Sequence, residues 1–436
     1  MDDTQYHIGP PAASEVALHQ IALTFLYIGC MSFSLAALEE TRSWMTQKRR
    51  WFTDDEYMQG LGLAQVLPGA PTSNLVAYLG FRLRGLSGAA ISTVFFLIPC
   101  FFLMLLLSHL YFAYGRMPVV SGLFRGLGAL VTGLVFNTVL NLWKKGVASA
   151  FNWLMALVGF SMVFFFKTGI IPILLITGGA SILMVMMIRR FPGCSWWMKK
   201  LKWFRIPQFI GRVNTKAAMD VNVPADYVSV CSRIPLSLGW RRLTRQALWL
   251  LLILGADMML IHVQPQVAAM GHSFLRIGAF VFGSGYAMLP FIQNIVIHRF
   301  EWLTSQQFAV GLALSLVTPG PVTIIGAFIG YKVAGVAGAA AGMVNMYFPA
   351  WAMTTLVAAP YAKAGQMEPI RRVIAGIVAG FIGTLVVVLI RLSADTLNDI
   401  PAIVMASSAF IVQRFVRVNT VWIVLGGAVI SLLIFR

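Results

Sequence analysis

Long apolar runs separated by short polar and basic stretches dominate this chain. Runs long enough to cross a hydrocarbon layer of ~30 Å recur about thirteen times. They lie near residues 16–38, 57–80, 88–113, 118–140, 147–166, 168–188, 246–264, 272–296, 306–330, 333–358, 370–391, 399–413 and 420–435. The pattern predicts an all-α integral membrane protein. The most polar stretch, residues 189–245, reads as a basic cytoplasmic linker.

Composition supports a membrane protein and excludes a soluble domain. Of the 436 residues, 58% are hydrophobic and 11% are charged, whereas a soluble chain carries roughly 25% charged residues. The net charge of +18 resides in short loops, which favours anchoring on the cytoplasmic side of a bilayer over binding to nucleic acid. The four cysteines are scattered without a CxxC motif, so neither a disulfide framework nor a metal site is expected.

An internal repeat divides the chain into two halves at an offset of about 250 residues. Aromatic, threonine, Pro-Gly and glycine positions recur in the same order. The matching pieces are Trp51-Phe52-Thr53 with Trp302-Leu303-Thr304, Leu67-Pro68-Gly69 with Thr318-Pro319-Gly320, and Tyr78-Leu79-Gly80-Phe81-Arg82 with Phe328-Ile329-Gly330-Tyr331-Lys332. Duplicated halves are a common plan among secondary transporters.

The distribution of basic residues orients the two halves. With the linker in the cytoplasm, most loop cations fall inside: Arg82, Arg84, Lys144, Lys145, Arg371, Arg372, Arg414 and Arg417. Lys332 falls outside together with Asp395 and Asp399, and the balance agrees with the positive-inside rule. The chain is therefore expected to form two six-segment halves as an inverted repeat, plus one linking transmembrane helix. The expected domains are 1–188, the first repeat; 189–245, the linker; 246–271, the linking helix; and 272–436, the second repeat. Whether segments 16–38 and 57–80 span or re-enter stays open, with re-entrant pairs favoured.

Helix breakers stand at matching places of the two halves, in Pro68-Gly69-Ala70-Pro71 and Pro319-Gly320-Pro321. A helix that resumes after such a break presents free N–H groups and a positive dipole end, which suit an anion. Thr72, Ser73 and Asn74, with Thr323 in the second half, could add side-chain donors. A structural kink is the alternative, but two equivalent breaks favour a binding site.

A second glycine-rich break follows in the second half, at Gly283, Ser284, Gly285 and Tyr286. Close helix packing explains these small residues as well as ligand binding does. The corresponding first-half stretch, Phe33-Ser34-Leu35-Ala36-Ala37, has no glycine.

Charged residues inside apolar segments are functional candidates because they are costly there. Arg82, Arg276 and Lys332 could compensate an anion's charge, and anchoring at the membrane interface explains them equally well. Asp257 is a candidate for proton coupling, with a buried structural acid as the alternative.

Enzymatic signatures are absent from the sequence: there is no HExxH, no P-loop and no GxSxG elbow. No cofactor is implied, and no catalytic residue is assigned. Without a nucleotide-binding loop, active transport would depend on an ion gradient or a partner subunit.

Several of these motifs resemble the chromate ion transporter family, in its long two-domain bacterial form. They are Phe274-Leu275-Arg276-Ile277-Gly278, Phe282 to Pro290, Thr318-Pro319-Gly320-Pro321 with Phe328-Ile329-Gly330-Tyr331, and Gln65 to Gly69 with Asn74 to Gly80. The resemblance implies a multi-pass protein of the bacterial inner membrane. It also implies export of chromate driven by the proton motive force, with sulfate as a competitor. The glycines missing from Ser34 to Ala37 depart from the family pattern.

Three functional hypotheses follow. The first is proton-coupled chromate export that confers chromate resistance, with the bilayer, chromate and protons as partners. The second is uptake or exchange of sulfate or another oxyanion. The third is a membrane scaffold or regulatory subunit that does not transport. A homodimer is left open.

Overall fold

The computed structural model describes residues 16–31, 36–114, 118–147, 149–190, 264–282, 285–364, 368–416 and 420–434, with single positions between 244 and 255. These residues form helices and their connections, and no β-strand occurs among them. The prediction of an all-α protein is confirmed. Asp257 and most of the predicted linker and linking helix lie outside the described residues. The described end of the predicted linking helix, residues 264–271, instead leads into α12 (Pro265–Phe280), so this second-half helix begins earlier than residue 272.

The helices of the two halves follow the same order. The first half contains α1 (Leu18–Met31), α2 (Ala36–Arg42), η1 (Ser43–Lys48), α3 (Asp54–Val66), α4 (Pro71–Tyr114), α5 (Pro118–Gly146), α6 (Ala150–Phe164) and α7 (Ile170–Arg190). The second contains α12 (Pro265–Phe280), η2 (Gly285–Met288), α13 (Leu289–Gln293), η3 (Asn294–Arg299), α14 (Ser305–Val317), η4 (Val322–Ile324), α15 (Ile325–Ala364), α16 (Glu368–Thr396), α17 (Ile400–Ile411), η5 (Val412–Val416) and α18 (Thr420–Ile434).

Five helical stretches of the described chain are long and apolar enough to cross a membrane. They are Pro71–Tyr114, Gly122–Lys144, Ile170–Met187, Val322–Val357 and Arg372–Thr396. Their outward side chains are apolar as well; Leu183 on α7 is 68% exposed and Trp422 on α18 is 69% exposed. Such surfaces are expected where a helix faces lipid rather than water.

Helices α4 and α15 each reverse direction at a glycine. Gly85 and Gly335 adopt φ values of +62° and +58°, a left-handed conformation that glycine adopts without steric cost. Beyond the reversal, the Ser92 hydroxyl donates to the Val76 carbonyl at 3.0 Å. In a continuous helix these residues would lie about 24 Å apart. Each helix therefore has a first arm (71–83 or 325–333) and a long arm (86–114 or 336–364).

The first arms also pack back on the helices that precede them. Asn74 bonds the carbonyl of Ala64, and Arg82 forms an ion pair with Glu56, so α3 and the first arm of α4 run antiparallel. We call this pair the first hairpin, and α14, η4 and the first arm of α15 the second hairpin. The apolar stretches 57–80 and 306–330 are thus helical hairpins rather than continuous helices, because a Pro-Gly pair ends the first helix of each.

The stretch predicted as one segment over 272–296 is also divided. Helix α12 ends at Phe280, and the chain continues through an extended Val281 into the short η2 and α13 helices. The carbonyl of Val281 accepts the Gly69 amide at 2.9 Å, so the chain at this point binds another segment instead of continuing its own helix.

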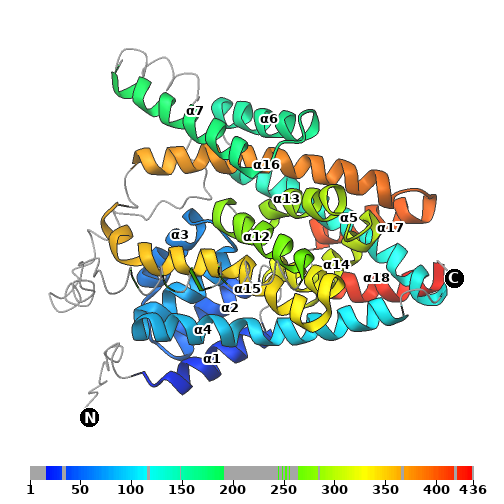
Figure 1. Ribbon diagram of the computed structural model, residues 1–436, viewed down its shortest axis with the longest axis horizontal. Coiled ribbons are helices and arrows are strands. Elements are labelled where there is room, and N and C mark those ends of the chain that lie inside the picture. The colour runs from blue at the N-terminus through cyan, green and yellow to red at the C-terminus, as the bar shows by residue number, and fades with distance from the viewer. Residues whose placement is uncertain are drawn as a thin grey trace, which may run out of the picture.

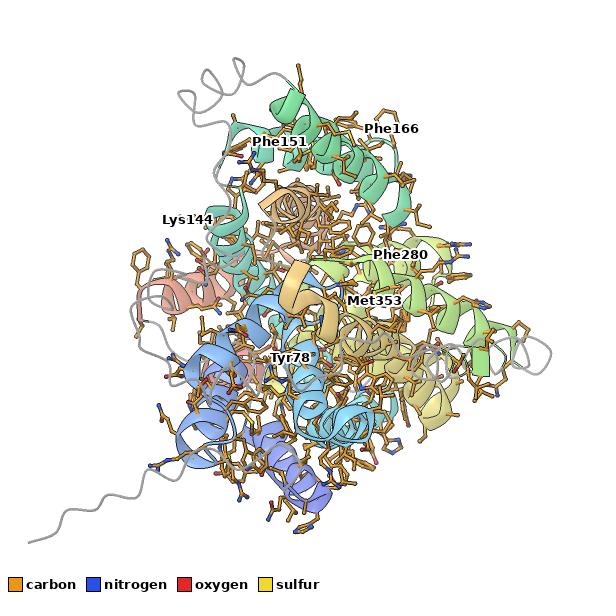
Figure 2. The ribbon with its side chains drawn as sticks, turned by 90° about the vertical axis from the view of Figure 1, so that its left-hand side faces the viewer. Tyr78, Lys144, Phe151, Phe166, Phe280 and Met353 are labelled. Carbon is orange, nitrogen blue, oxygen red and sulfur yellow. The ribbon has the colours of Figure 1, made fainter. Side chains whose placement is uncertain are left out.

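The two halves interlock through their later helices. Helices α6 and α7 pack on α16 of the other half, which lies beneath them in Figure 1, and α17 and α18 pack on α5. The contacts recur at matching positions: Gly133 meets the backbone of Ala406, and Gly383 meets the backbone of Ala156. Figure 2 views the bundle from one end, with many of the helices running toward the viewer. Each half thus packs its last helices on a helix of the other half, which holds the two halves together.

Candidate functional site

The hairpin tips lie where each half contacts the other. Gly69 and Gly320 have φ values of +101° and +107°, which turn the chain sharply between the two helices of each hairpin. A Cβ atom on Gly69 would clash with Ala350, and one on Gly320 would lie 3.0 Å from the Cys100 sulfur. Cys100 and Ala350 stand near the middles of the long arms. Each tip therefore reaches the mid-depth of the other half's long helix.

The segment after α12 joins both tips. Pro68 pairs with Phe282 in an isolated antiparallel bridge. A Cβ atom on Gly285 would lie 3.2 Å from the Thr323 methyl group and 3.9 Å from the Ala70 Cβ. The structure thus brings together three of the stretches predicted for substrate binding. Tyr286 lies half-buried next to Gly285, while Gly283 and Ser284 lie outside the described residues.

Backbone amides at both tips remain available to a ligand. The first N–H groups of a helix have no partner within the helix. At the first tip these belong to Thr72 and Ser73, and at the second to Val322 and Thr323; none of them forms a hydrogen bond within the described part of the chain. Ala70 and Pro321, which precede these helices, have no side-chain oxygen that could cap them.

Side-chain hydrogen bonds hold the two tips in different ways. The Asn74 amide donates to the carbonyls of Pro68 at 2.8 Å and Ala64 at 3.3 Å, while its own oxygen has no described partner. At the second tip the Thr323 hydroxyl bonds the Tyr347 hydroxyl at 2.7 Å. Asn74, Thr323 and Tyr347 are all buried, so they fix the tips without contact with solvent.

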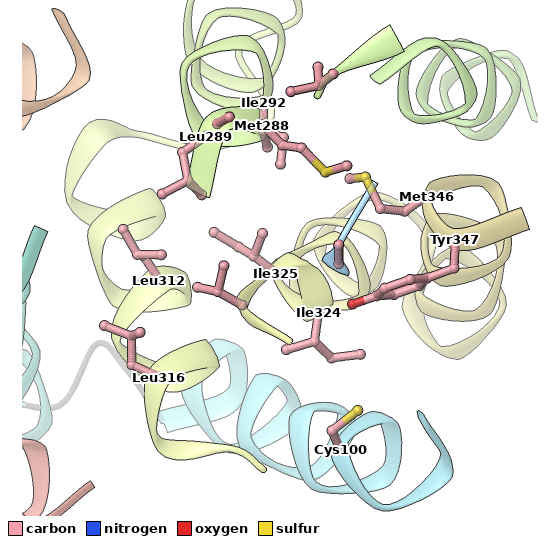
Figure 3. Close-up of a cluster of buried hydrophobic side chains, with 14 of the residues drawn as sticks. Cys100, Met288, Leu289, Ile292, Leu312, Leu316, Ile324, Ile325, Met346 and Tyr347 are labelled. Atoms are coloured by element: carbon pink, nitrogen blue, oxygen red, sulfur yellow. The ribbon is translucent and has the colours of Figure 1, made fainter. Parts of the chain in front are cut away.

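Apolar side chains surround the second tip. Figure 3 shows Cys100, Leu312, Leu316, Ile324, Ile325 and Tyr347 in one buried cluster drawn from four elements. A charge or dipole in such surroundings is screened far less than in water. Amide dipoles at this tip are therefore screened less than those at an exposed helix end.

The predicted charge-compensating residues do not lie at the tips. Arg82 is at the base of the first hairpin, where its guanidinium contacts Glu56 at 3.2 Å and the Tyr78 hydroxyl at 3.0 Å. Lys332 is exposed, and its ammonium lies 5.3 Å from the centre of the Phe112 ring. Arg276 is on the exposed face of α12. Anchoring at the membrane interface, the alternative to charge compensation, therefore remains open for Arg82, Arg276 and Lys332.

Sequence reasoning missed the residues that the tips pack against. Ala350, Cys100, Val281 and Tyr347 carry no helix breaker and no charge, so nothing in their local pattern distinguishes them. One signal was present in the repeat, since Cys100 and Ala350 are separated by the repeat offset.

Comparison with protein families identifies the chain. A model described as chromate transporter matches residues 19–184 and 268–432, which together contain both hairpins. The chain belongs to the chromate transporter family. It is accordingly a transport protein rather than an enzyme, and a multi-pass membrane protein.

Individual relatives of this transporter match over nearly its whole length. It is 28% identical over 427 residues to the chromate transport protein of Cupriavidus metallidurans, covering 97% of this chain and 94% of the relative. It is 28% identical to a probable chromate transport protein of Synechococcus elongatus, covering 94% and 92%. A chromate transport protein of Pseudomonas aeruginosa is 25% identical, covering 100% and 95%. No solved structure matches the chain.

Proposed function

We propose that this transporter exports chromate from the cytoplasm of a bacterium across its inner membrane, driven by the proton gradient. The observation that carries the proposal is the convergence of two hairpin tips, each with amides that have no described acceptor, at the mid-depth of two long helices. Family membership and relatives named chromate transport proteins supply the substrate class.

A tetrahedral dianion suits this arrangement chemically. Its oxygens would accept from the amides of Thr72, Ser73, Val322 and Thr323, so that each tip holds part of the charge. In the structure the tips pack directly on Ala350 and Cys100. Binding therefore requires the tips to move away from these helices, and movement of one half against the other provides alternating access.

The proposal includes opposite orientations for the two halves, with the basic loops in the cytoplasm. The reciprocal contacts of the hairpin tips with Cys100 and Ala350 support a two-fold relation between the halves. A cysteine placed in the loop after η1, at Arg49, is expected to react only from the cytoplasmic side. Labelling from outside intact cells would contradict this topology.

Chromate uptake into everted membrane vesicles tests the function. We expect accumulation that an uncoupler abolishes and excess sulfate inhibits. Val322→Pro removes one amide donor, and Pro321 already has the extended conformation that precedes a proline. Position 71 of the first half is a proline at the equivalent place, so the fold should persist.

Val322→Ala is the matched control, because it shortens the side chain and keeps the amide. We expect chromate transport efficiency to fall at least about tenfold in Val322→Pro and to change little in Val322→Ala, since hydrogen bonds to charged groups contribute about 1.5–3 kcal/mol. Equal activity of the two variants would refute an amide site at the second tip.

A non-transporting scaffold is the second candidate, and the apolar packing around the second tip favours it. Vesicles that accumulate neither chromate nor sulfate above the empty-vector level would support the scaffold. Accumulation of sulfate alone would instead support uptake or exchange of a different oxyanion.

A further inference from the structure

A cavity of about 190 Å³ lies on the outward side of α12, between the start of α7 and the η3 helix. Its polar lining comes from Ser273, Arg276, Asn294 and Arg299. Ser273, Arg276 and Phe280 share one face of α12, while Phe274 and Gly278 face α15. Figure 2 labels Phe280 at this side of the bundle. The cavity thus has α12 between it and the hairpin tips.

The cavity carries positive charge that the described chain does not neutralise. Neither Arg276 nor Arg299 forms an ion pair with a carboxylate in the described part of the chain, and none of the cavity-lining residues is acidic. The first turn of the long helix α7 also lines it, at Ile170 and Ile171, and contributes its positive dipole end.

The surroundings show the same positive field. Burial and the nearby charges of Arg391 and Lys167 lower the pKa of His298, although Asp395 acts in the opposite direction. His298 directly precedes Arg299. Burial is the largest cause of this pKa shift, and the contributions of the two cations indicate that positive charge lies near Arg299.

The first half has no such cavity charge at the equivalent place. Gly29 and Gly278 make equivalent contacts with Phe96 and Met346, which aligns Arg276 with Tyr27. The matching π-helices η1 and η3 end at Lys48 and Arg299, which aligns these two residues. There the Tyr27 ring packs on Trp44, and Lys48 lies over Trp44 and pairs with Glu40 at 3.7 Å. Phe291 takes the place of Glu40 in the second half. Arg299 therefore has no counterpart of the Glu40 partner, and Arg276 stands where the first half has an uncharged tyrosine.

We propose that this cavity is a second anion site, which binds a tetrahedral oxyanion group between Arg276 and Arg299. Its volume holds a four-oxygen anion with a few waters, each of which occupies about 30 Å³. Paired arginines match the geometry of such groups. The group could belong to a free oxyanion or to the phosphate of an anionic lipid. Arg276 lies about 7 Å along α12 from Val281, whose carbonyl accepts a hydrogen bond from Gly69 of the first tip. This position suits a loading role, in which the cavity delivers the anion to the hairpin tips. That loading role, and the second bound ion expected at the hairpin tips in the test below, rest on the proposed function.

Chromate binding to the full chain in phosphatidylcholine nanodiscs tests the site. We expect two chromate ions per chain, falling to one in the double variant Arg276→Gln, Arg299→Gln, with the single variants at least about tenfold weaker at that site. Lys48→Gln is the matched control, because Lys48 is the first-half equivalent of Arg299 and already pairs with Glu40. This variant should retain both chromate ions. Both arginines are exposed, so we expect the variants to fold normally, and thermal melting checks this.

A second arm identifies the source of the oxyanion. Native mass spectrometry after reconstitution with phosphatidylglycerol would show lipid retained by the unmodified protein and lost from the double variant if the ligand is a lipid phosphate. The proposal is overturned if neither chromate stoichiometry nor lipid retention changes in the double variant. Failure of the proposed function is distinguishable, because arginine-dependent binding would persist in a protein whose vesicles accumulate no chromate.

Discussion

The first and second hairpins share a backbone but differ in the contacts that hold them. Both begin with a threonine capping box, at Thr53 and Thr304, and both turn at a left-handed glycine. At the base of the first hairpin, Glu56 pairs with Arg82, whose side chain is only 8% exposed. The corresponding residues of the second are Gln307 and an exposed Lys332, which form no ion pair with each other.

The hydrogen bonds at the two tips also differ in whether they stay within the hairpin. In the first hairpin Asn74 ties the break to α3, so the hairpin is held together by its own residues. In the second, Thr323 bonds Tyr347 of the long arm of α15, so the tip is tied to a neighbouring helix instead. Backbone geometry and its free amides are what the halves have in common. The side-chain contacts differ between the halves, and they determine which neighbouring segment each tip is attached to. Because the first hairpin is held by its own residues, we expect it to move as a rigid unit.

The largest expected effect comes from adding a methyl group at the tip glycines. Gly69→Ala would clash with Ala350, whereas Gly320→Ala would place its Cβ 3.0 Å from the Cys100 sulfur. Both also force alanine into a positive φ. We expect Gly69→Ala to destabilise the protein by about 3 kcal/mol and Gly320→Ala by about 1–2 kcal/mol, measured by thermal melting in detergent.

Gly426→Ala, on α18 with open space around it, is the control and should be neutral. Adding Ala350→Gly to Gly69→Ala should recover part of the loss, because it removes the clash but not the strained φ. Equal destabilisation by both tip substitutions would show that backbone strain, not the contact across the halves, limits the tips.

The hairpins also show how far the sequence leads. The repeat and its Pro-Gly pairs predicted a helix break in each half, because proline excludes a continuous helix. The structure ends the two helices at Val66 and Val317, directly before these stretches. The predicted segments 57–80 and 88–113, and 306–330 and 333–358, already placed a connection near Gly85 and Gly335. The sequence did not predict that the connection is a left-handed glycine, or that the arms pack as closely as the Ser92–Val76 contact shows. Likewise, embedded arginines were interpreted as candidates for one site, but their partners come from distant segments: Glu56 for Arg82, and the α7 cavity for Arg276.

Removing the ion pair at its base should make the first hairpin resemble the second. Glu56→Gln leaves the Arg82 guanidinium mostly buried without its carboxylate, although the Tyr78 hydroxyl remains. We expect a loss of about 2 kcal/mol in unfolding free energy, since a partly buried charge is left without its partner. The reverse change, Gln307→Glu, gives the second hairpin a carboxylate at the position equivalent to Glu56, where the equivalent of Arg82 is the exposed Lys332. It should alter stability by less than about 1 kcal/mol. A similar loss in both variants would remove the proposed difference in rigidity.

The smallest expected effect concerns the tie between the second tip and its long helix. Tyr347→Phe removes the hydroxyl that bonds Thr323 and retains the ring that packs in the cluster of Figure 3. One neutral hydrogen bond contributes about 1 kcal/mol, so exchange of the hydrogen-bonded amides of Ile324 and Ile325 should accelerate about fivefold while global stability changes little. Tyr331→Phe is the matched control, because its hydroxyl bonds His109 at 2.8 Å, away from the tip. If exchange at the second tip is unchanged in Tyr347→Phe, the tip is held by its apolar packing alone, and the two hairpins would then differ only at their bases.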